Sequence, residues 1–178
     1  MVVGVLALQG DFEAHSKIVE TLGGEPREVR IPEHLDGLDS LIIPGGESTT
    51  MTLGIEREGL AEPLRQFVRS GKPVLGTCAG LIMLDRDHLG VLDVSAKRNA
   101  FGRQRQSFEA DLDVKGFNGG PLRAVFIRAP WVEETGEGVE VLAEIEGHPV
   151  AVRQDNMLAV AFHPEIAGEE RIHKWVVP

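Results

Sequence analysis

The sequence predicts an α/β protein in three layers, with a mixed, mostly parallel sheet and helices on both faces. The apolar runs Val2–Leu8, Ser40–Ile43 and Pro73–Leu75 are typical of strands buried on both faces. Segments with helical periodicity separate these runs, and this alternation implies right-handed crossovers and a parallel sheet. In such sheets, ligands bind beyond the carboxyl ends of the strands.

Two helical regions connect the strands of the first half. One is expected to begin at Asp11, which can cap it, and to run to about Leu22. His15 lies on the apolar face of this helix and is interpreted as an ordinary packing residue. The second region covers about residues 50–70 and is expected to be interrupted near Gly54 and Gly59.

The second half of the chain predicts shorter strands separated by turn residues. The last two strands are expected to form a hairpin that ends at His163, and residues 169–175 predict a short helix. The expected strands cover residues 90–94, 108–112, 123–127, 139–145, 149–153 and 157–162.

Composition favours one domain over residues 1–178, with 42% hydrophobic residues available for a core. A net charge of −10 without a clustered basic stripe disfavours binding to nucleic acids and to membrane surfaces. No apolar run approaches the roughly 20 residues that span a bilayer, and the first residues lack the basic region of a signal peptide. The single cysteine suits a reducing compartment, so we expect a cytoplasmic protein.

The segment Gly76–Gly80, Gly-Thr-Cys-Ala-Gly, predicts a strand, a tight turn and a helix. It matches the Gly-x-Ser-x-Gly nucleophile elbow with sulfur in place of oxygen. By itself, Cys78 fits a small buried hydrophobe equally well, because short motifs have many chance matches. Gly10, Gly46 and Cys78 all fall at predicted strand ends, which favours the nucleophile.

His163 and Glu165 supply the partners that a cysteine nucleophile needs. A free thiol titrates near pH 8.5, so a histidine must take its proton and a carboxylate must orient that histidine. If the chain stays extended through Pro164, the two side chains lie on one face. The backbone N–H groups of Ala79 and Gly46 are candidates for an oxyanion hole, although Gly46 would also suit an ordinary turn.

Other chemistries find little support in the sequence. The remaining histidines have no partners at metal-ligand spacing, so no metal site is expected. No Gly-rich phosphate loop occurs, and we expect no cofactor.

Several motifs carry a family resemblance. Three of them resemble, in this order, those of triad (class I) glutamine amidotransferases: Pro44–Ser48, Gly76–Gly80 and His163–Glu165. Three more resemble the glutaminase subunits of pyridoxal 5′-phosphate synthases: Gly4–Glu13, Arg98–Gln104 and Phe126–Pro130. The resemblance covers nearly the whole chain and implies the flavodoxin-like fold of class I glutamine amidotransferases.

This resemblance implies hydrolysis of L-glutamine to L-glutamate and ammonia. The ammonia would pass to a separate synthase subunit, with which the glutaminase forms a hetero-oligomer and without which it is poorly active. By position, Cys78 is the nucleophile, His163 the general base and acid, and Glu165 its orienting partner. The positions that match glutamine-binding residues are Gly46, Glu47, Ser48, Arg98, Ile127 and Arg128. Charge pairing places an arginine near the α-carboxylate of glutamine and Glu47 near its α-ammonium.

Three alternatives remain open from the residues. A glutaminase could serve an imidazole or purine pathway, although the Arg98–Gln104 stretch argues against it. A second alternative is a cysteine hydrolase or redox sensor, but these usually have the histidine close after the cysteine. A third is a non-catalytic subunit, which would not need the complete triad that this chain has.

The connection at Asp85–His88 is shorter than the family's, and the last helix is expected to be clipped at Pro178; both bear on the partner interface.

Overall fold

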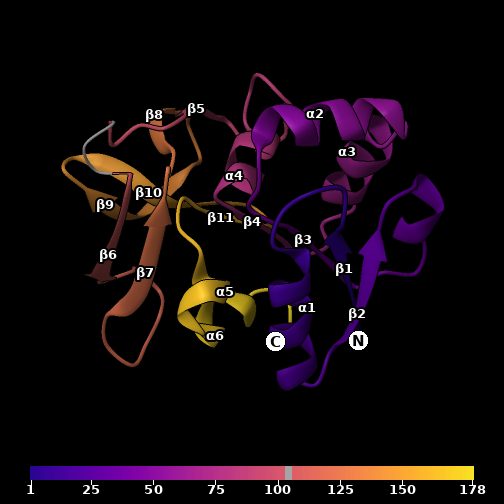
Figure 1. The fold of residues 1–178 in the computed structure, drawn as a ribbon, viewed down its shortest axis with the longest axis horizontal. Helices are drawn as coiled ribbons and strands as arrows, with labels where there is room; N and C mark the ends of the chain where they lie inside the picture. The colour runs from indigo at the N-terminus through magenta and orange to yellow at the C-terminus, as the bar shows by residue number, and fades with distance from the viewer. Residues whose placement is uncertain (103–105) are drawn as a thin grey trace.

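The computed structural model describes residues 1–102 and 106–178 and is built around a seven-stranded sheet (Figure 1). Its strands are β1 Val2–Leu6, β2 Glu25–Val29, β3 Ser40–Ile43, β4 Val74–Thr77, β9 Glu140–Ile145, β10 His148–Gln154 and β11 Met157–Val160. They lie in the order β2-β1-β3-β4-β11-β10-β9. The pairings from β2 to β11 are parallel and the last two are antiparallel, so the predicted mixed, mostly parallel sheet is confirmed.

Helices cover both faces of the sheet, as predicted (Figure 1). The helices are α1 Phe12–Thr21, η1 Pro32–Leu35, α2 Ser48–Arg57, α3 Ala61–Arg69, α4 Ala79–Leu84, α5 Pro164–Ala167 and α6 Glu170–His173. Side chains of α2, α3 and α4 form one apolar cluster with Leu41 and Ile43 of β3, whereas Ile42 joins the cluster under α1 and α6. This division follows from the alternation of side chains along a strand.

Two small antiparallel sheets extend the second half of the chain. One pairs β5 Val94–Lys97 with β8 Trp131–Thr135, and the other pairs β6 Ser107–Leu112 with β7 Leu122–Ile127. The strand β8 was not predicted, and the predicted strand at 90–94 was wrong, because only Val94 of it belongs to β5. The N–H of His163 donates to the carbonyl of Val125 (2.8 Å), which ties β7 to the end of the central sheet.

The helical region at 50–70 divides into α2 and α3 near Gly59, as predicted, but α2 continues through Gly54. Gly54 packs against Leu8, since a Cβ there would lie 3.3 Å from the Leu8 Cδ1 atom. Among the residues that the structure describes, no helix has the length and apolar character needed to cross a membrane.

The loops after β1, β3, β4 and β11 meet at one edge of the sheet, and glycines allow their close approach. A Cβ on Gly80 would lie 1.9 Å from the carbonyl oxygen of Ile43 at the end of β3. A Cβ on Gly10, whose φ is +96°, would lie 1.8 Å from the carbonyl oxygen of Gly45. Neither oxygen belongs to a flexible side chain, so these contacts require glycine.

Replacing Gly80 with alanine is expected to lower the free energy of unfolding by about 2–3 kcal/mol, because the backbone of β3 or α4 must shift. Gly71→Ala is the matched control: its φ is +80°, but no atom of the described residues lies within 4 Å of the position that its Cβ would take. We expect a loss of roughly 1 kcal/mol there from backbone strain alone. Urea denaturation measures both, and equal losses would contradict the packing argument.

Candidate active site

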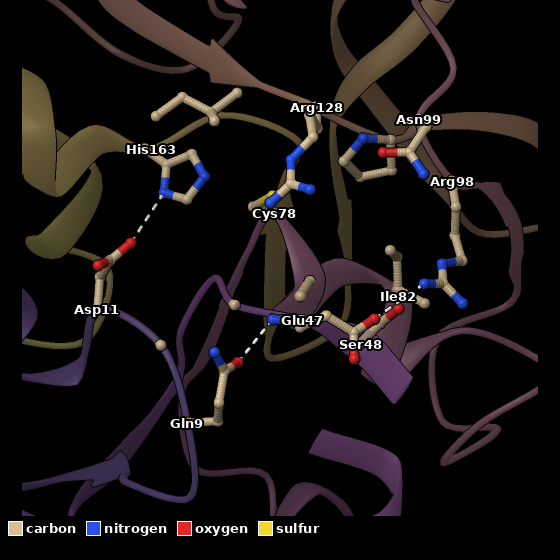
Figure 2. A pocket seen from close by; sticks show the side chains of 15 residues that line it. Gln9, Asp11, Glu47, Ser48, Cys78, Ile82, Arg98, Asn99, Arg128 and His163 are labelled. Carbon is tan, nitrogen blue, oxygen red and sulfur yellow. Dashed lines mark hydrogen bonds and ion pairs between the residues drawn. The ribbon is translucent and has the colours of Figure 1, made fainter. Parts of the chain in front are cut away.

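The loops that follow β1, β3, β4 and β11 line a cavity of about 290 Å³ (Figure 2). Nearly all of the predicted site residues line it: Gly46, Glu47, Ser48, Cys78, Ala79, Arg98, Ile127, Arg128 and His163. Sequence reasoning did not assign the other lining residues to the site: Gln9, Gly10, Asp11, Ile82, Asn99 and Pro130. Glu165 lies behind His163 and outside the lining.

Cys78 occupies the turn between β4 and α4, as the elbow motif predicts. Its backbone has φ 48° and ψ −106°, a conformation that non-glycine residues rarely adopt. Two hydrogen bonds hold this turn: the Cys78 N–H donates to Val160 O (2.8 Å), and the Leu81 N–H donates to Cys78 O (3.1 Å). The side chain is buried but borders the cavity, so a strained turn presents the thiol to a ligand.

His163 lies between Cys78 and Glu165, with its Nδ1 atom 2.6 Å from Glu165 Oε1. Gly45, in the loop after β3, packs closely against both His163 and Cys78. A Cβ there would lie 2.5 Å from His163 Cε1 and 3.2 Å from Cys78 Cβ. Burial by itself would lower the pKa of His163. The hydrogen bonds and charges of Cys78 and Glu165 outweigh burial and raise this pKa to about 10. The ring therefore lies between the sulfur and the carboxylate, the position that a general base and acid for a cysteine nucleophile requires.

The route by which His163 and Glu165 meet differs from the prediction of an extended chain. His163 is the N-cap of α5, with φ −106° and ψ 87°, and Pro164 opens the helix. Proline suits the first helical position, since it has no N–H to leave unpaired and its φ is already helical. Glu165 thus reaches His163 across the first turn of a helix.

The carboxylate of Glu165 has no exposed side-chain surface, and its two oxygens face different groups. Oε1 takes the hydrogen bond of His163, and Oε2 lies 3.3 Å from the Nε2 atom of His15. His15 was interpreted as a packing residue, and that interpretation was incomplete. A fully buried histidine requires polar partners, so its place on the apolar face of α1 was the signal that could have found it.

The two predicted oxyanion donors border the cavity. Ala79 is the first residue of α4, so its N–H has no acceptor within the helix. The carbonyl of Gly45 accepts the Asp11 N–H (3.3 Å), which directs the Gly46 N–H to the opposite side of that trans peptide. The role of both N–H groups in an oxyanion hole stays a prediction.

Glu47 caps helix α2, and its half-exposed carboxylate borders the cavity. Its carboxylate accepts the N–H groups of Thr49 (3.1 Å) and Thr50 (2.7 Å), and these bonds lower its pKa to about 2. Arg98 also contacts Glu47 (Nη2 to Oε1, 3.0 Å). The Glu47 N–H donates to Gln9 Oε1 (2.6 Å), so Gln9 joins the β1 and β3 loops (Figure 2).

Arg128 presents its guanidinium to the cavity on the side of Cys78 (Figure 2). Its φ is 43°, and its N–H donates to Gln106 O (2.5 Å). No ion pair joins Arg128 to a carboxylate of residues 1–102 or 106–178. Ile127 ends β7 beside it, and Ser48 is the buried first residue of α2. Arg103 and Gln104, which end the predicted Arg98–Gln104 motif, lie outside the described residues.

Within the described part of the chain, one group of side chains has the spacing of metal ligands. Donor atoms of Asp11, His163 and Glu165 lie within 4.8 Å of one another. The His163 and Glu165 atoms already bond to each other at 2.6 Å, and Asp11 Oδ2 lies 3.7 Å from His163 Nδ1. This arrangement holds a proton between ring and carboxylate, and the absence of a resident metal stays a prediction.

Although Asp11 occupies the N-cap of α1, its side chain makes no capping bond, contrary to prediction.

Curated relatives share about half of their residues with this chain. A protein of Streptomyces avermitilis named pyridoxal 5′-phosphate synthase subunit PdxT is 53% identical over 97% of this chain and 90% of its own length. A protein of the same name from Mycobacteroides abscessus is 52% identical over 98% of this chain and 95% of its own length. The predicted resemblance to this group is confirmed.

Solved structures share the fold. A crystal structure described as a glutamine amidotransferase superposes with a TM-score of 0.92 at 48% identity, covering 99% of this chain and 97% of that one. A structure from Thermoplasma acidophilum, described as part of a putative GMP synthase, gives 0.75 at 17% identity, covering 99% and 92% of the two chains, and supports the fold alone. The family model described as the SNO glutamine amidotransferase family matches residues 5–178. The chain therefore belongs to the SNO glutamine amidotransferase family.

Proposed function

We propose that this protein hydrolyses L-glutamine to L-glutamate and ammonia, with Cys78 as nucleophile. The observation that carries the proposal is the ordered series Cys78, His163 and Glu165, in which the histidine contacts the thiol on one side and the carboxylate on the other. Membership of a glutamine amidotransferase family supports glutamine as the substrate. A cavity of about 290 Å³ is large enough for one amino acid.

The chemistry follows from the positions of these groups. The Cys78 thiolate attacks the side-chain amide carbon of glutamine, and backbone N–H groups of Ala79 and Gly46 stabilise the oxyanion. His163 gives its proton to the departing nitrogen, so ammonia leaves and a γ-glutamyl thioester remains. His163 then takes a proton from water, the resulting hydroxide attacks the thioester, and glutamate leaves as the thiol is restored. Glu165 orients the ring throughout.

Arg128 is the best candidate to bind the α-carboxylate of glutamine, since it faces the cavity without an ion pair to a described carboxylate. Arg98 contacts Glu47, and Glu47 caps α2, so these two residues shape the opposite wall. Glu47 keeps its negative charge at neutral pH and can attract the α-ammonium group. Gly46, Ser48 and Ile127 complete the surface that would contact glutamine.

We infer that the ammonia serves a pyridoxal 5′-phosphate synthase, because relatives about 50% identical bear the name of a subunit of that enzyme. The partner is then the synthase subunit. A structure described as PurLQS from Thermotoga maritima shares only 20% identity, at a TM-score of 0.77 with 99% and 96% of the chains covered, so it gives no support for a purine acceptor.

We place the protein in the cytoplasm, where a thiol nucleophile stays reduced, and regard residues 1–178 as one domain.

Cys78→Ala is expected to abolish ammonia release from glutamine, because no other thiol exists in the chain. Glutamate dehydrogenase-coupled assays, with and without the synthase subunit of a pyridoxal 5′-phosphate synthase, measure this. Circular dichroism is expected to show an unchanged fold. Activity that survives in Cys78→Ala would end the proposal, and wild-type activity unaffected by the synthase subunit would remove its coupling to that partner.

Arg128→Gln is expected to raise KM for glutamine about 10–100-fold and to change kcat less, because a charge-assisted contact to the substrate is lost. Arg57→Gln is the control, since Arg57 lies at the far end of α2 and pairs with Glu58. Steady-state kinetics with the synthase subunit present measures both variants. An unchanged KM in Arg128→Gln would contradict the assignment.

Because the pKa of His163 is raised to about 10, the ring stays protonated beside the sulfur well above neutrality. A cation beside a thiol favours the reactive thiolate, whereas an isolated thiol is less than about 1% ionised at pH 6. We expect Cys78 to react with iodoacetamide at pH 6 at least about 10-fold faster in the wild type than in His163→Gln. The two rates should converge towards pH 10, as the ring loses its proton. Equal rates at pH 6 would contradict the ion pair.

A further inference from the structure

Beneath the triad lies a second layer of buried polar groups that the mechanism above does not use. His15 on α1 and His173 on α6 are both fully buried, and Glu169 and Thr77 are buried beside them. His15 Nδ1 lies 2.8 Å from His173 Nε2, and His15 Nε2 lies 3.2 Å from Thr77 Oγ1. These groups connect two helices to the residue that precedes Cys78.

The layer meets the triad at Glu165. Among the described residues, Oε2 of Glu165 has no well-aligned hydrogen bond, although the carboxylate is buried. The Nε2 atom of His15 lies 3.3 Å from it. A buried carboxylate oxygen without a donor is costly, so the proton on the facing nitrogen decides how firmly Glu165 is held.

Two proton arrangements are consistent with these contacts. In one, His15 Nε2–H faces Glu165 Oε2 and Thr77 Oγ1, and His15 Nδ1 accepts from His173 Nε2–H. In the other, His15 Nδ1–H donates to His173 Nε2 while His173 Nδ1–H donates to Glu169 O, 3.4 Å away. The second gains one long neutral bond but turns the lone pair of His15 Nε2 towards a carboxylate oxygen. The first satisfies the charged group, and bonds to charged groups are the stronger ones.

We propose that His15 is a positioning residue, whose Nε2–H holds Glu165 in the orientation that supports His163, and that His173 fixes the tautomer of His15. The inference rests on the proposed function, since it assigns Glu165 a role in orienting the catalytic ring. Burial, with the charges of His173 and His163, lowers the pKa of His15 well below its usual value. Burial also lowers the pKa of His173 to about 4. Both rings are thus neutral at pH 7, and they support Glu165 without cancelling its charge.

Two amide substitutions of His15 distinguish the tautomers, because each can place an N–H group at the position of one ring nitrogen. His15→Gln can place an amide N–H where Nε2 stands, facing Glu165, whereas His15→Asn reaches only the position of Nδ1, facing His173. His15→Leu removes both. His34→Gln is the matched control, because His34 lies in η1, and its ring contacts the backbone N–H of Arg30 (3.3 Å).

The readout is the rate at which iodoacetamide modifies Cys78, the chain's only cysteine, followed by mass spectrometry at pH 6 and at pH 10. At pH 6, His15→Leu and His15→Asn should react about 10-fold more slowly than the wild type, because a ring that Glu165 no longer orients pairs less well with the sulfur. His15→Gln should stay within about 3-fold of the wild type, and His34→Gln should match it. At pH 10 the wild type and all variants should react at the same rate. A variant that unfolds should react faster than the wild type, because Cys78 is buried in the folded protein.

Folded His15→Leu and His15→Asn proteins that react at the wild-type rate at pH 6 would overturn the proposal. Rescue by His15→Asn and not by His15→Gln would also overturn it, since that result assigns the Nδ1 tautomer. If His15→Leu unfolds, the Gln and Asn pair still decides. Failure of the proposed function gives a different result, namely ammonia release from glutamine that survives in Cys78→Ala.

A double variant tests whether His15 acts through Glu165. Adding His15→Leu to Glu165→Gln should change the pH 6 rate by less than about 2-fold, because the residue through which His15 acts has already been altered. If the two substitutions instead lower the pH 6 rate by factors that multiply, His15 does not act through Glu165.

Discussion

The strained turn at Cys78 is the constraint on which the rest of the site depends. A non-glycine residue at φ 48° costs on the order of 1–3 kcal/mol and persists only where its surroundings determine it. Here the surroundings are β11, which accepts the Cys78 N–H, and α4, which begins at the next residue. Gly80 lets α4 approach the end of β3 closely enough to complete the turn. Gly45, in the loop after β3, lies beside the Cβ atom of Cys78.

The carboxyl edge of the sheet then gathers groups that are far apart in the sequence. Parallel strands β1, β3, β4 and β11 all end there, so their loops supply Gln9, Gly46, Cys78 and His163 to one cavity. Arg128 comes from the end of β7, outside the central sheet, and the bond from the His163 N–H to Val125 ties this strand to the edge. A substrate would therefore be held between the central sheet and the small β6–β7 sheet.

Much of this arrangement could be predicted from sequence, because its signals are local. The apolar runs predicted the parallel strands, and glycines around Cys78 predicted the elbow. The contact of His163 with Glu165 was predicted correctly, but from an extended backbone, whereas Pro164 opens helix α5. Both backbone conformations place the two side chains near each other. The strand β8 and the partners of His15 depend on contacts between distant segments, and no local pattern encodes these.

The most direct test of the account is whether Cys78 becomes acylated during turnover. Acid quenching of the protein with glutamine and the synthase subunit, followed by peptide mass spectrometry, should reveal a γ-glutamyl group on the peptide that contains Cys78. The account predicts that this adduct is absent in Cys78→Ala and disappears as glutamine is exhausted. Sustained ammonia release by the wild type with the adduct on another residue would contradict it.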